Sequence, residues 1–330
     1  MKMIVSTVIV AILAGLGALA WYTGYLPGLR SAKATFTPPP DSEIPAGKFG
    51  DEVRFGEEVF REPATHAAEY VGNDLRCSNC HLQAGRLAGA SPMWAAYVAY
   101  PAYRTKNEHV NSFQTRLQGC FRYSMNGKVP PLGDPVLVAL ESYSYFLAKG
   151  LPIDEPAAGR GFPALPKPSL SPEYSRGALV YAQQCATCHG ADGLGQSSAG
   201  KLVFPPLWGP RSYNWGAGMT SIKSAAEFIQ ANMPFGLGKT LSVQQAWDVA
   251  TYIDSQTRPQ DPRFRGDVAE TRAKYHDNPF SMYGDTVNGM VLGDPASTPP
   301  FGTVPGETPS VPEAEEPPFP YSDTTLAQQK

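Results

Sequence analysis

The chain has 330 residues and a formal net charge of −3, with 32 glycines and 33 prolines. A chain of this length favours two domains with additional tails, and its slightly negative charge gives no indication that it binds nucleic acid. Glycine and proline both exceed their averages of roughly 7% and 5%, which indicates long loops and linkers between the folded elements.

The N-terminal segment, residues 1–22, is mostly apolar after Lys2 and has two interpretations. It has the features of a signal peptide, because the small residues Ala18 and Ala20 form an acceptable cleavage site. It also has the features of a retained membrane anchor, because about 18 apolar residues nearly span a bilayer. The length of the apolar run and the polar spacer that follows it, residues 23–48, favour the anchor.

Four segments show the pattern expected of helices. Residues 51–61 place four apolar side chains on one broad helical face, although Gly56 interrupts the pattern. The second segment begins with a capping signal, Asp134, followed by a proline at the first helical position. The predicted helices cover residues 51–61, the stretch from Pro135 to just before Gly150, the stretch from Ser171 into the sequence around Cys185 and His189, and residues 242–256.

Four of the five cysteines lie in two Cys-x-x-Cys-His motifs. Such a motif is typical of c-type haem attachment, in which the two thiols bond covalently to the haem and the histidine binds the iron. A zinc ribbon does not fit, because its cysteine pairs lie about 15 to 20 residues apart and these pairs are much further apart. Two covalently bound haem c groups are therefore predicted, and because haem c is attached outside the cytoplasm, so is export. The motifs are Cys77-Ser-Asn-Cys80-His81 and Cys185-Ala-Thr-Cys188-His189.

Each motif histidine leaves a sixth position on its iron for a second ligand. In the second half, Met233 lies just before the last predicted helix and is preferred to Met219. In the first half, Met125 occupies the equivalent position, but Cys120 is the one cysteine outside the motifs. An odd cysteine in an exported protein indicates a reactive thiol, an intermolecular bond or a metal ligand. A buried, inert Cys120 and a His109 ligand are the remaining alternatives.

The two halves repeat the same order of features: a helix, the Cys-x-x-Cys-His motif, a loop with aromatic residues and prolines, a methionine and a last helix. An internal repeat that includes the chemistry indicates two copies of one domain type. The order resembles the class I cytochrome c fold. The expected fold is mainly α, with two class I cytochrome c-like domains, an N-terminal membrane anchor or signal segment, and a Pro-rich C-terminal tail.

The expected boundaries follow from composition. A stretch with five prolines separates the two repeats and is interpreted as a linker. The C-terminal stretch is poor in large apolar residues, so it is not expected to bury enough surface to fold. The segments are residues 1–22 (signal or anchor), 23–48 (spacer), 49–150 (first haem domain, with the active-site haem), 151–170 (Pro-rich linker), 171–262 (second haem domain, for electron transfer) and 263–330 (extended tail).

Several short motifs lie around Cys120 and around the methionines of the second half. They are Pro101-Ala-Tyr-Arg104, Val110-Asn111, Gly119-Cys120-Phe121, Ser124-Met125-Asn126-Gly127, Tyr213-Asn214-Trp215-Gly216-Ala217-Gly218-Met219 and Asn232-Met233-Pro234. These motifs resemble those of the dihaem thiosulfate dehydrogenases, which form tetrathionate, and the resemblance covers about residues 50 to 260. It implies that Cys120 is a ligand of an active-site haem, and that Arg116 and Ser124 contact the substrate. Asn232 replaces a lysine that this family often has beside the methionine of the second haem, so a lysine ligand switch is not expected.

Basic residues around Cys120 suit an anionic substrate. Arg116 and Ser124 lie four residues before and after it, so the three share a face if the segment is helical. Arg104 and Lys106, from the preceding loop, are further candidates. The resemblance implies a dihaem cytochrome c. The haem motifs place it in the periplasm, and the apolar run of residues 1–22 favours attachment to the cytoplasmic membrane. It would oxidise thiosulfate to tetrathionate and pass electrons to a soluble c-type cytochrome or another periplasmic acceptor. The alternative is a membrane-tethered dihaem electron carrier, with no substrate of its own, that serves an oxidase or photosynthetic complex.

Overall fold

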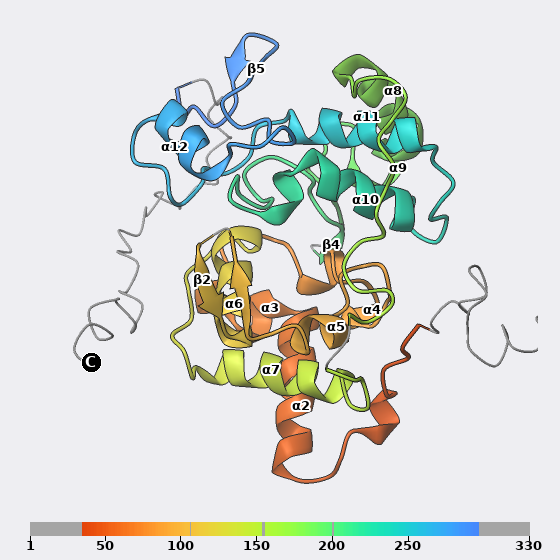
Figure 1. Cartoon of the computed structure of the whole chain (residues 1–330), viewed down its shortest axis with the longest axis vertical. Coiled ribbons are helices and arrows are strands. Elements are labelled where there is room, and N and C mark those ends of the chain that lie inside the picture. The colour runs from red at the N-terminus through yellow and green to blue at the C-terminus, as the bar shows by residue number, and fades with distance from the viewer. Residues whose placement is uncertain (1–34, 106, 154–155, 200, 297–330) are drawn as a thin grey trace, which may run out of the picture.

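The computed structural model describes residues 35–105, 107–153, 156–199 and 201–296 (Figure 1). The predicted signal or anchor segment, residues 1–22, lies outside the described residues, as do Lys106 and the end of the predicted tail. In the part of the chain that is described, no helix combines the length and apolar character needed to cross a membrane.

The first half is built on two crossing helices, α2 (Lys48–Arg61) and α7 (Pro135–Leu147). Both were predicted from the sequence, and the side chain of Asp134 caps α7 by accepting a hydrogen bond from the Val136 N–H group. Gly56 lies where the helices cross, and a Cβ atom there would be 2.0 Å from the Ala139 carbonyl oxygen. The glycine that weakens the helical pattern is therefore what allows the close crossing.

The second half repeats this crossing with α8 (Tyr174–Gln184) and α11 (Val243–Asp254), and α10 (Ile222–Asn232) packs against α11. A Cβ at Gly177 would be 2.1 Å from the Asp248 carbonyl oxygen, so the crossing depends on a glycine here too. Helix α8 begins three residues later than the sequence predicts, because Glu173, and not Ser171, caps it. It ends before the haem motif, which forms a separate turn, α9 (Ala186–His189).

Short elements connect these helices and carry most of the candidate site. All three sheets in the described residues are two-stranded and antiparallel. In the first half the elements are η1 (Asp41–Glu43), α3 (Pro63–His66), η2 (Ala68–Tyr70), η3 (Cys77–Asn79), α4 (Leu82–Gly85), α5 (Met93–Tyr97), β1 (Ala102–Arg104), β2 (His109–Asn111), α6 (Phe113–Gly119) and the short π-helix η4 (Cys120–Ser124). In the second half they are β3 (Gln196–Ser198), β4 (Lys201–Phe204), η5 (Gly218–Thr220), α12 (Val268–Tyr275), β5 (Thr286–Val287) and β6 (Met290–Val291).

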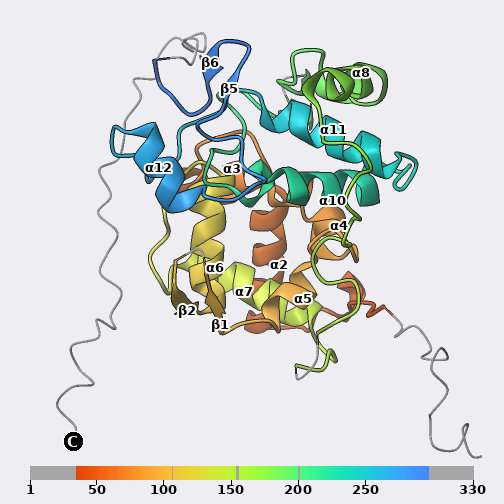
Figure 2. The same ribbon diagram turned by 45° about the horizontal axis from the view of Figure 1, so that its top comes forward.

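The prediction of an extended tail from residue 263 is wrong for residues 263–296. This stretch forms α12, β5 and β6, which lie beside the second domain (Figure 2). Tyr283 and Leu292 are fully buried together with Trp215 of the second domain. The stretch folds because a few isolated apolar residues find a surface on the second domain, an arrangement that leaves no periodic pattern in the sequence.

The two domains pack directly against each other, and their cores interleave. Tyr213 and Ala217 of the second domain belong to the core of the first, while Leu82 and Ala90 of the first domain belong to the core of the second. The domain that carries the first motif lies below the second in Figure 1, with η4 close to the boundary between them. This interface brings the surroundings of Cys120 against the second domain.

Candidate active site

The two motif histidines are held in the same way. Nδ1 of His81 lies 2.6 Å from the Ser91 carbonyl oxygen, and Nδ1 of His189 lies 2.9 Å from the Pro205 carbonyl oxygen. A carbonyl can only accept, so each Nδ1 carries the proton and each Nε2 keeps the lone pair that binds iron. Burial lowers the pKa of both imidazoles, which favours the neutral form that a metal ligand requires.

The motif cysteines are unpaired and partly buried, as thioether formation with a haem requires. Burial raises the pKa of Cys77 to about 12 and that of Cys80 to about 11, and in both cases the Cys120 sulfur adds to the shift. In the described part of the chain, His, Cys, Asp and Glu side chains form no group of three or more suited to a metal ion. Two partly buried thiols followed by a neutral histidine, present in both motifs, fit covalent haem.

Cys120 lies where α6 ends and the π-helix η4 begins. Nη1 of Arg116, one turn earlier, donates a hydrogen bond to the Cys120 sulfur over 3.1 Å. The charge of Cys120 is the main cause of a raised pKa of Arg116, with Tyr100 as a further contributor. Arg116 in turn helps to lower the pKa of His81. Arg116 and Cys120 therefore both shift the pKa values of residues in the first haem motif.

The other predicted substrate residues within the described part of the chain lie on β1 and at the end of η4. Arg104 is exposed on β1, paired in register with His109 on β2, and Lys106 lies outside the described residues. Ser124 is half-buried at the end of η4, where its carbonyl oxygen accepts a hydrogen bond from Nδ2 of Asn73. A shared face for Ser124 and Cys120 was expected from α-helical rotation, whereas the turn between them is of π type.

The methionines differ in their surroundings. Met125 is buried in the core of the first domain. Met233 follows the end of α10 and packs against the second core alone, while Met219 is partly buried and touches both cores. Asn232, beside Met233, donates hydrogen bonds to the carbonyl oxygens of Gly89 and Phe228 over 3.2 and 3.1 Å. Its amide is therefore engaged with the backbone.

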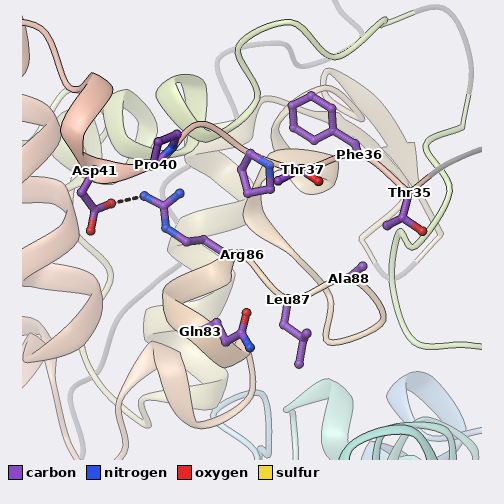
Figure 3. Close-up of a pocket in the computed structure, with 10 residues that line it drawn as sticks. Thr35, Phe36, Thr37, Pro40, Asp41, Gln83, Arg86, Leu87 and Ala88 are labelled. Atoms are coloured by element: carbon purple, nitrogen blue, oxygen red, sulfur yellow. Dashed lines mark hydrogen bonds and ion pairs between the residues drawn. The ribbon is translucent and has the colours of Figure 1, made fainter.

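A cavity of about 530 Å³ lies apart from this chemistry, between residues 35–41 and the segment that follows His81 (Figure 3). Arg86 points into the space between these segments, but its guanidinium is paired with Asp41 and donates to the Pro39 carbonyl oxygen. Neither Cys120 nor Arg116 lines the cavity. The cavity forms where residues 35–41 cross the first domain.

Sequence reasoning missed the residues that hold the Cys120 segment from outside. Asn73 and Asn214 donate hydrogen bonds to carbonyl groups in and around η4, and Arg263 lies over the ring of Tyr123. Asn214 was noticed only as part of a motif. Its partners are more than 80 positions away in the chain, so no local pattern reveals them.

Comparisons with known proteins agree with this geometry. Residues 172–253 match the family described as cytochrome C oxidase, cbb3-type, subunit III. The chain is 60% identical over 261 residues to a thiosulfate dehydrogenase of Thiomonas intermedia (strain K12), covering 79% of this chain and 83% of that one. It is 48% identical to a thiosulfate dehydrogenase of Stutzerimonas stutzeri (strain A1501), covering 81% and 87%.

A solved structure is similar throughout most of the described chain. It is that of the thiosulfate dehydrogenase TsdBA from Marichromatium purpuratum in its as-isolated form, with a TM-score of 0.76 and 51% identity. The match covers 78% of this chain and 57% of that one. With both Cys-x-x-Cys-His motifs in place, the chain is a c-type cytochrome with covalently bound haem c, and it belongs to the thiosulfate dehydrogenase family.

Proposed function

We propose that the chain oxidises thiosulfate to tetrathionate in the periplasm, with the first haem as the site of chemistry and the second as the exit for electrons. The observation that carries the proposal is the hydrogen bond from Arg116 Nη1 to the Cys120 sulfur, beside the first haem motif. Relatives named thiosulfate dehydrogenase support the substrate. A pure electron carrier would have no use for a free thiol and a guanidinium at this place.

The reaction joins two thiosulfate dianions through a new S–S bond and releases two electrons. The two haems supply one-electron acceptors. Cys120 would be a ligand of the first haem's iron and would also hold the substrate. Its thiolate sulfur and the terminal sulfur of one thiosulfate would lose two electrons as they form an S–S bond, and the second thiosulfate would displace the thiolate to give tetrathionate. Arg116 donates a charge-assisted hydrogen bond at this sulfur and attracts a dianion into the site.

The two distal ligands give the electrons a direction. A thiolate donates electron density to iron and stabilises its oxidised form, whereas a His/Met pair raises the reduction potential. If Cys120 holds the first haem and Met233 the second, the first haem would have the lower potential, and electrons would pass from it to the second. A soluble c-type cytochrome or another periplasmic acceptor then takes them. We assign Ser124 and the exposed Arg104 to the approach of the anion, together with Lys106.

Attachment to the cytoplasmic membrane through residues 1–22 completes the proposed location. The motivation is the apolar N-terminal run, which is long enough to be an anchor. The protein is expected in the membrane fraction of cells and is expected to be released by detergent. Mature protein that begins near Trp21 and stays in the soluble fraction would show that the segment is a cleaved signal.

The function is tested by measuring thiosulfate oxidation with an artificial electron acceptor. Cys120→Gly should lose activity by orders of magnitude, because no thiol is left to hold the substrate. Arg116→Ala should chiefly raise KM, on the order of tenfold, with a loss that depends on salt. Gly119→Ala is a matched control, because a Cβ there would meet Arg116 at 3.7 Å, an ordinary contact. Full activity in Cys120→Gly would contradict the proposal.

A further inference from the structure

The helix that carries Cys120 ends in a turn whose last carbonyl groups find their partners outside the helix. The Met125 N–H group donates to the Cys120 carbonyl over 2.9 Å, which closes the five-residue turn of η4. The carbonyls of Arg122, Tyr123 and Ser124, which lie in this turn, each accept a hydrogen bond from a residue far away in the chain. Partly buried carbonyl groups at a helix end need such acceptor bonds.

Asn214 of the second domain satisfies two of these three carbonyls. Its side-chain Nδ2 donates to the Arg122 carbonyl over 2.9 Å, and its backbone N–H donates to the Tyr123 carbonyl over 3.2 Å. The same Nδ2 donates to Oδ1 of Asn126 over 2.9 Å, just beyond the turn. Asn214 is 1% exposed, so water does not compete for these bonds. One buried residue of the second domain thus caps the helix of the first.

Asn214 is itself held in a fixed orientation. Its Oδ1 accepts a hydrogen bond from the Gly216 N–H group over 3.0 Å, and the next residue, Trp215, donates its N–H to the Pro259 carbonyl. Because Oδ1 is occupied in this way, the Nδ2 group is directed at the Cys120 segment. The third carbonyl, of Ser124, accepts from Asn73, which also donates to the Ser212 carbonyl over 3.1 Å.

The side chain of Tyr123 gives the second domain a further hold on the same turn. Its ring packs against Gly216, where a Cβ atom would be 2.4 Å from a ring carbon. The guanidinium of Arg263 lies 5.1 Å from the centre of this ring. Asp261 fixes Arg263 through hydrogen bonds of 2.9 and 2.6 Å and accepts another from His276. The folded C-terminal stretch, residues 263–296, therefore also contacts the turn η4, in which Cys120 lies.

We propose that Asn214 and Arg263 are positioning residues for Cys120, so that the second domain sets the geometry of the cysteine at the first haem. The inference rests on the proposed role of Cys120 and extends it: the active site of one domain is completed by the other. A helix end without its cap frays within its last turn. Cys120 lies at the start of that turn, so release of the cap displaces the sulfur relative to the motif of Cys77 and Cys80.

The test compares the full chain carrying both haems with its Asn214→Asp variant. Aspartate keeps the shape and the acceptor for Gly216 but replaces both Nδ2 donor bonds with oxygen facing oxygen. The thiolate-ligated ferric signal of the first haem in electron paramagnetic resonance should lose intensity, while that of the second haem stays. Turnover should fall on the order of tenfold with KM within about twofold, since misplacement costs rate more than binding.

Arg211→Ala is the matched control across the same interface. Arg211 forms a largely exposed ion pair with Asp74, and such pairs contribute little to stability, so both haem signals and turnover should stay as in the unmodified chain. Tyr123→Phe keeps the ring against Gly216 and should retain activity, whereas Tyr123→Ala should behave like Asn214→Asp. These paired variants separate a specific hold on Cys120 from general domain packing.

Three results would overturn the inference: an unchanged first-haem signal in Asn214→Asp, an equal change in the signals of both haems, or the same loss of the first-haem signal in Arg211→Ala. None of these depends on whether thiosulfate is the substrate, because the first-haem signal is read without it. Failure of the proposed function shows up separately, as full thiosulfate oxidation by Cys120→Gly. The two hypotheses are therefore distinguishable in one set of variants.

Discussion

The two haem-binding halves share a scaffold and differ where the second iron ligand is expected. Each half crosses two helices at a glycine, Gly56 or Gly177, and each holds its motif histidine through a backbone carbonyl. The first half then places Arg116 and Cys120 opposite its motif, whereas the second offers methionines against an apolar core. One scaffold thus supports two kinds of site.

The difference shows where the function is encoded. The crossing helices are alike in both halves, and the residues that differ lie in the connecting segments, Cys120 with Arg116 in one half and the methionines in the other. A cysteine with a guanidinium suits a reacting sulfur anion, whereas a methionine in an apolar core suits reversible electron transfer. The comparison also predicts what happens when a residue of one half is converted to the other type.

The largest effect is expected from Cys120→Met, which gives the first half the ligand type proposed for the second. The variant keeps a sulfur ligand but removes the negative charge and the nucleophile. Thiosulfate oxidation should fall by about 10³-fold or more, as when other enzymes lose their nucleophile, while the first haem's reduction potential rises. Steady-state kinetics and a spectroscopic redox titration measure both. Retained activity at a raised potential would show that the reaction needs neither the thiol nor its negative charge.

A smaller effect is expected from Met233→Ala in the second half. Removing the thioether should lower the second haem's potential on the order of 100 mV, within the roughly 0.8 V that axial ligands span. The methionine–iron charge-transfer band of the oxidised spectrum should disappear, and the first haem should change little. Met219→Ala is the control, since Met219 touches both cores. Loss of the band in that variant alone would exchange the two assignments.

The sequence revealed the parts of the molecule whose determinants are local. The Cys-x-x-Cys-His motifs indicate their cofactor, and the cap at Asp134 and the helix predicted from residue 242 give helix starts that the structure confirms. Each depends on residues within a few positions of one another. A single sequence is enough to recognise patterns of this kind.

The parts that sequence reasoning missed depend on distant partners. The fold of residues 263–296 rests on Tyr283 and Leu292 meeting Trp215, and the hold on η4 rests on Asn214. The π-type turn at Cys120 is likewise completed by hydrogen bonds from outside its helix. The neighbouring sequence does not indicate these partners, because a hydrogen bond between distant residues leaves no periodic pattern.

The smallest expected effect concerns the stability of the second half. This half contains a fully buried carboxyl group, Asp254. Burial raises its pKa to about 7, and Arg258, whose Nη2 lies 3.4 Å from Oδ1, offsets this only in part. In the unfolded chain the group has its ordinary pKa of about 3.9. At a pH between these two pKa values, the folded protein therefore keeps a proton on Asp254 that the unfolded chain has released.

Stability that depends on this proton is present below about pH 4 and is lost as pH rises through about 7. Asp254→Asn keeps an acceptor for Arg258 but cannot ionise, so it should remove this loss. Its unfolding midpoint should exceed that of the unmodified chain by a few degrees at pH 8, and the gap should shrink towards pH 5. Thermal unfolding followed by haem absorbance measures both midpoints, with turnover expected to be unchanged. A gap that is the same at pH 5 and pH 8 would show that Asp254 stays ionised in the folded protein, held by Arg258 despite its burial.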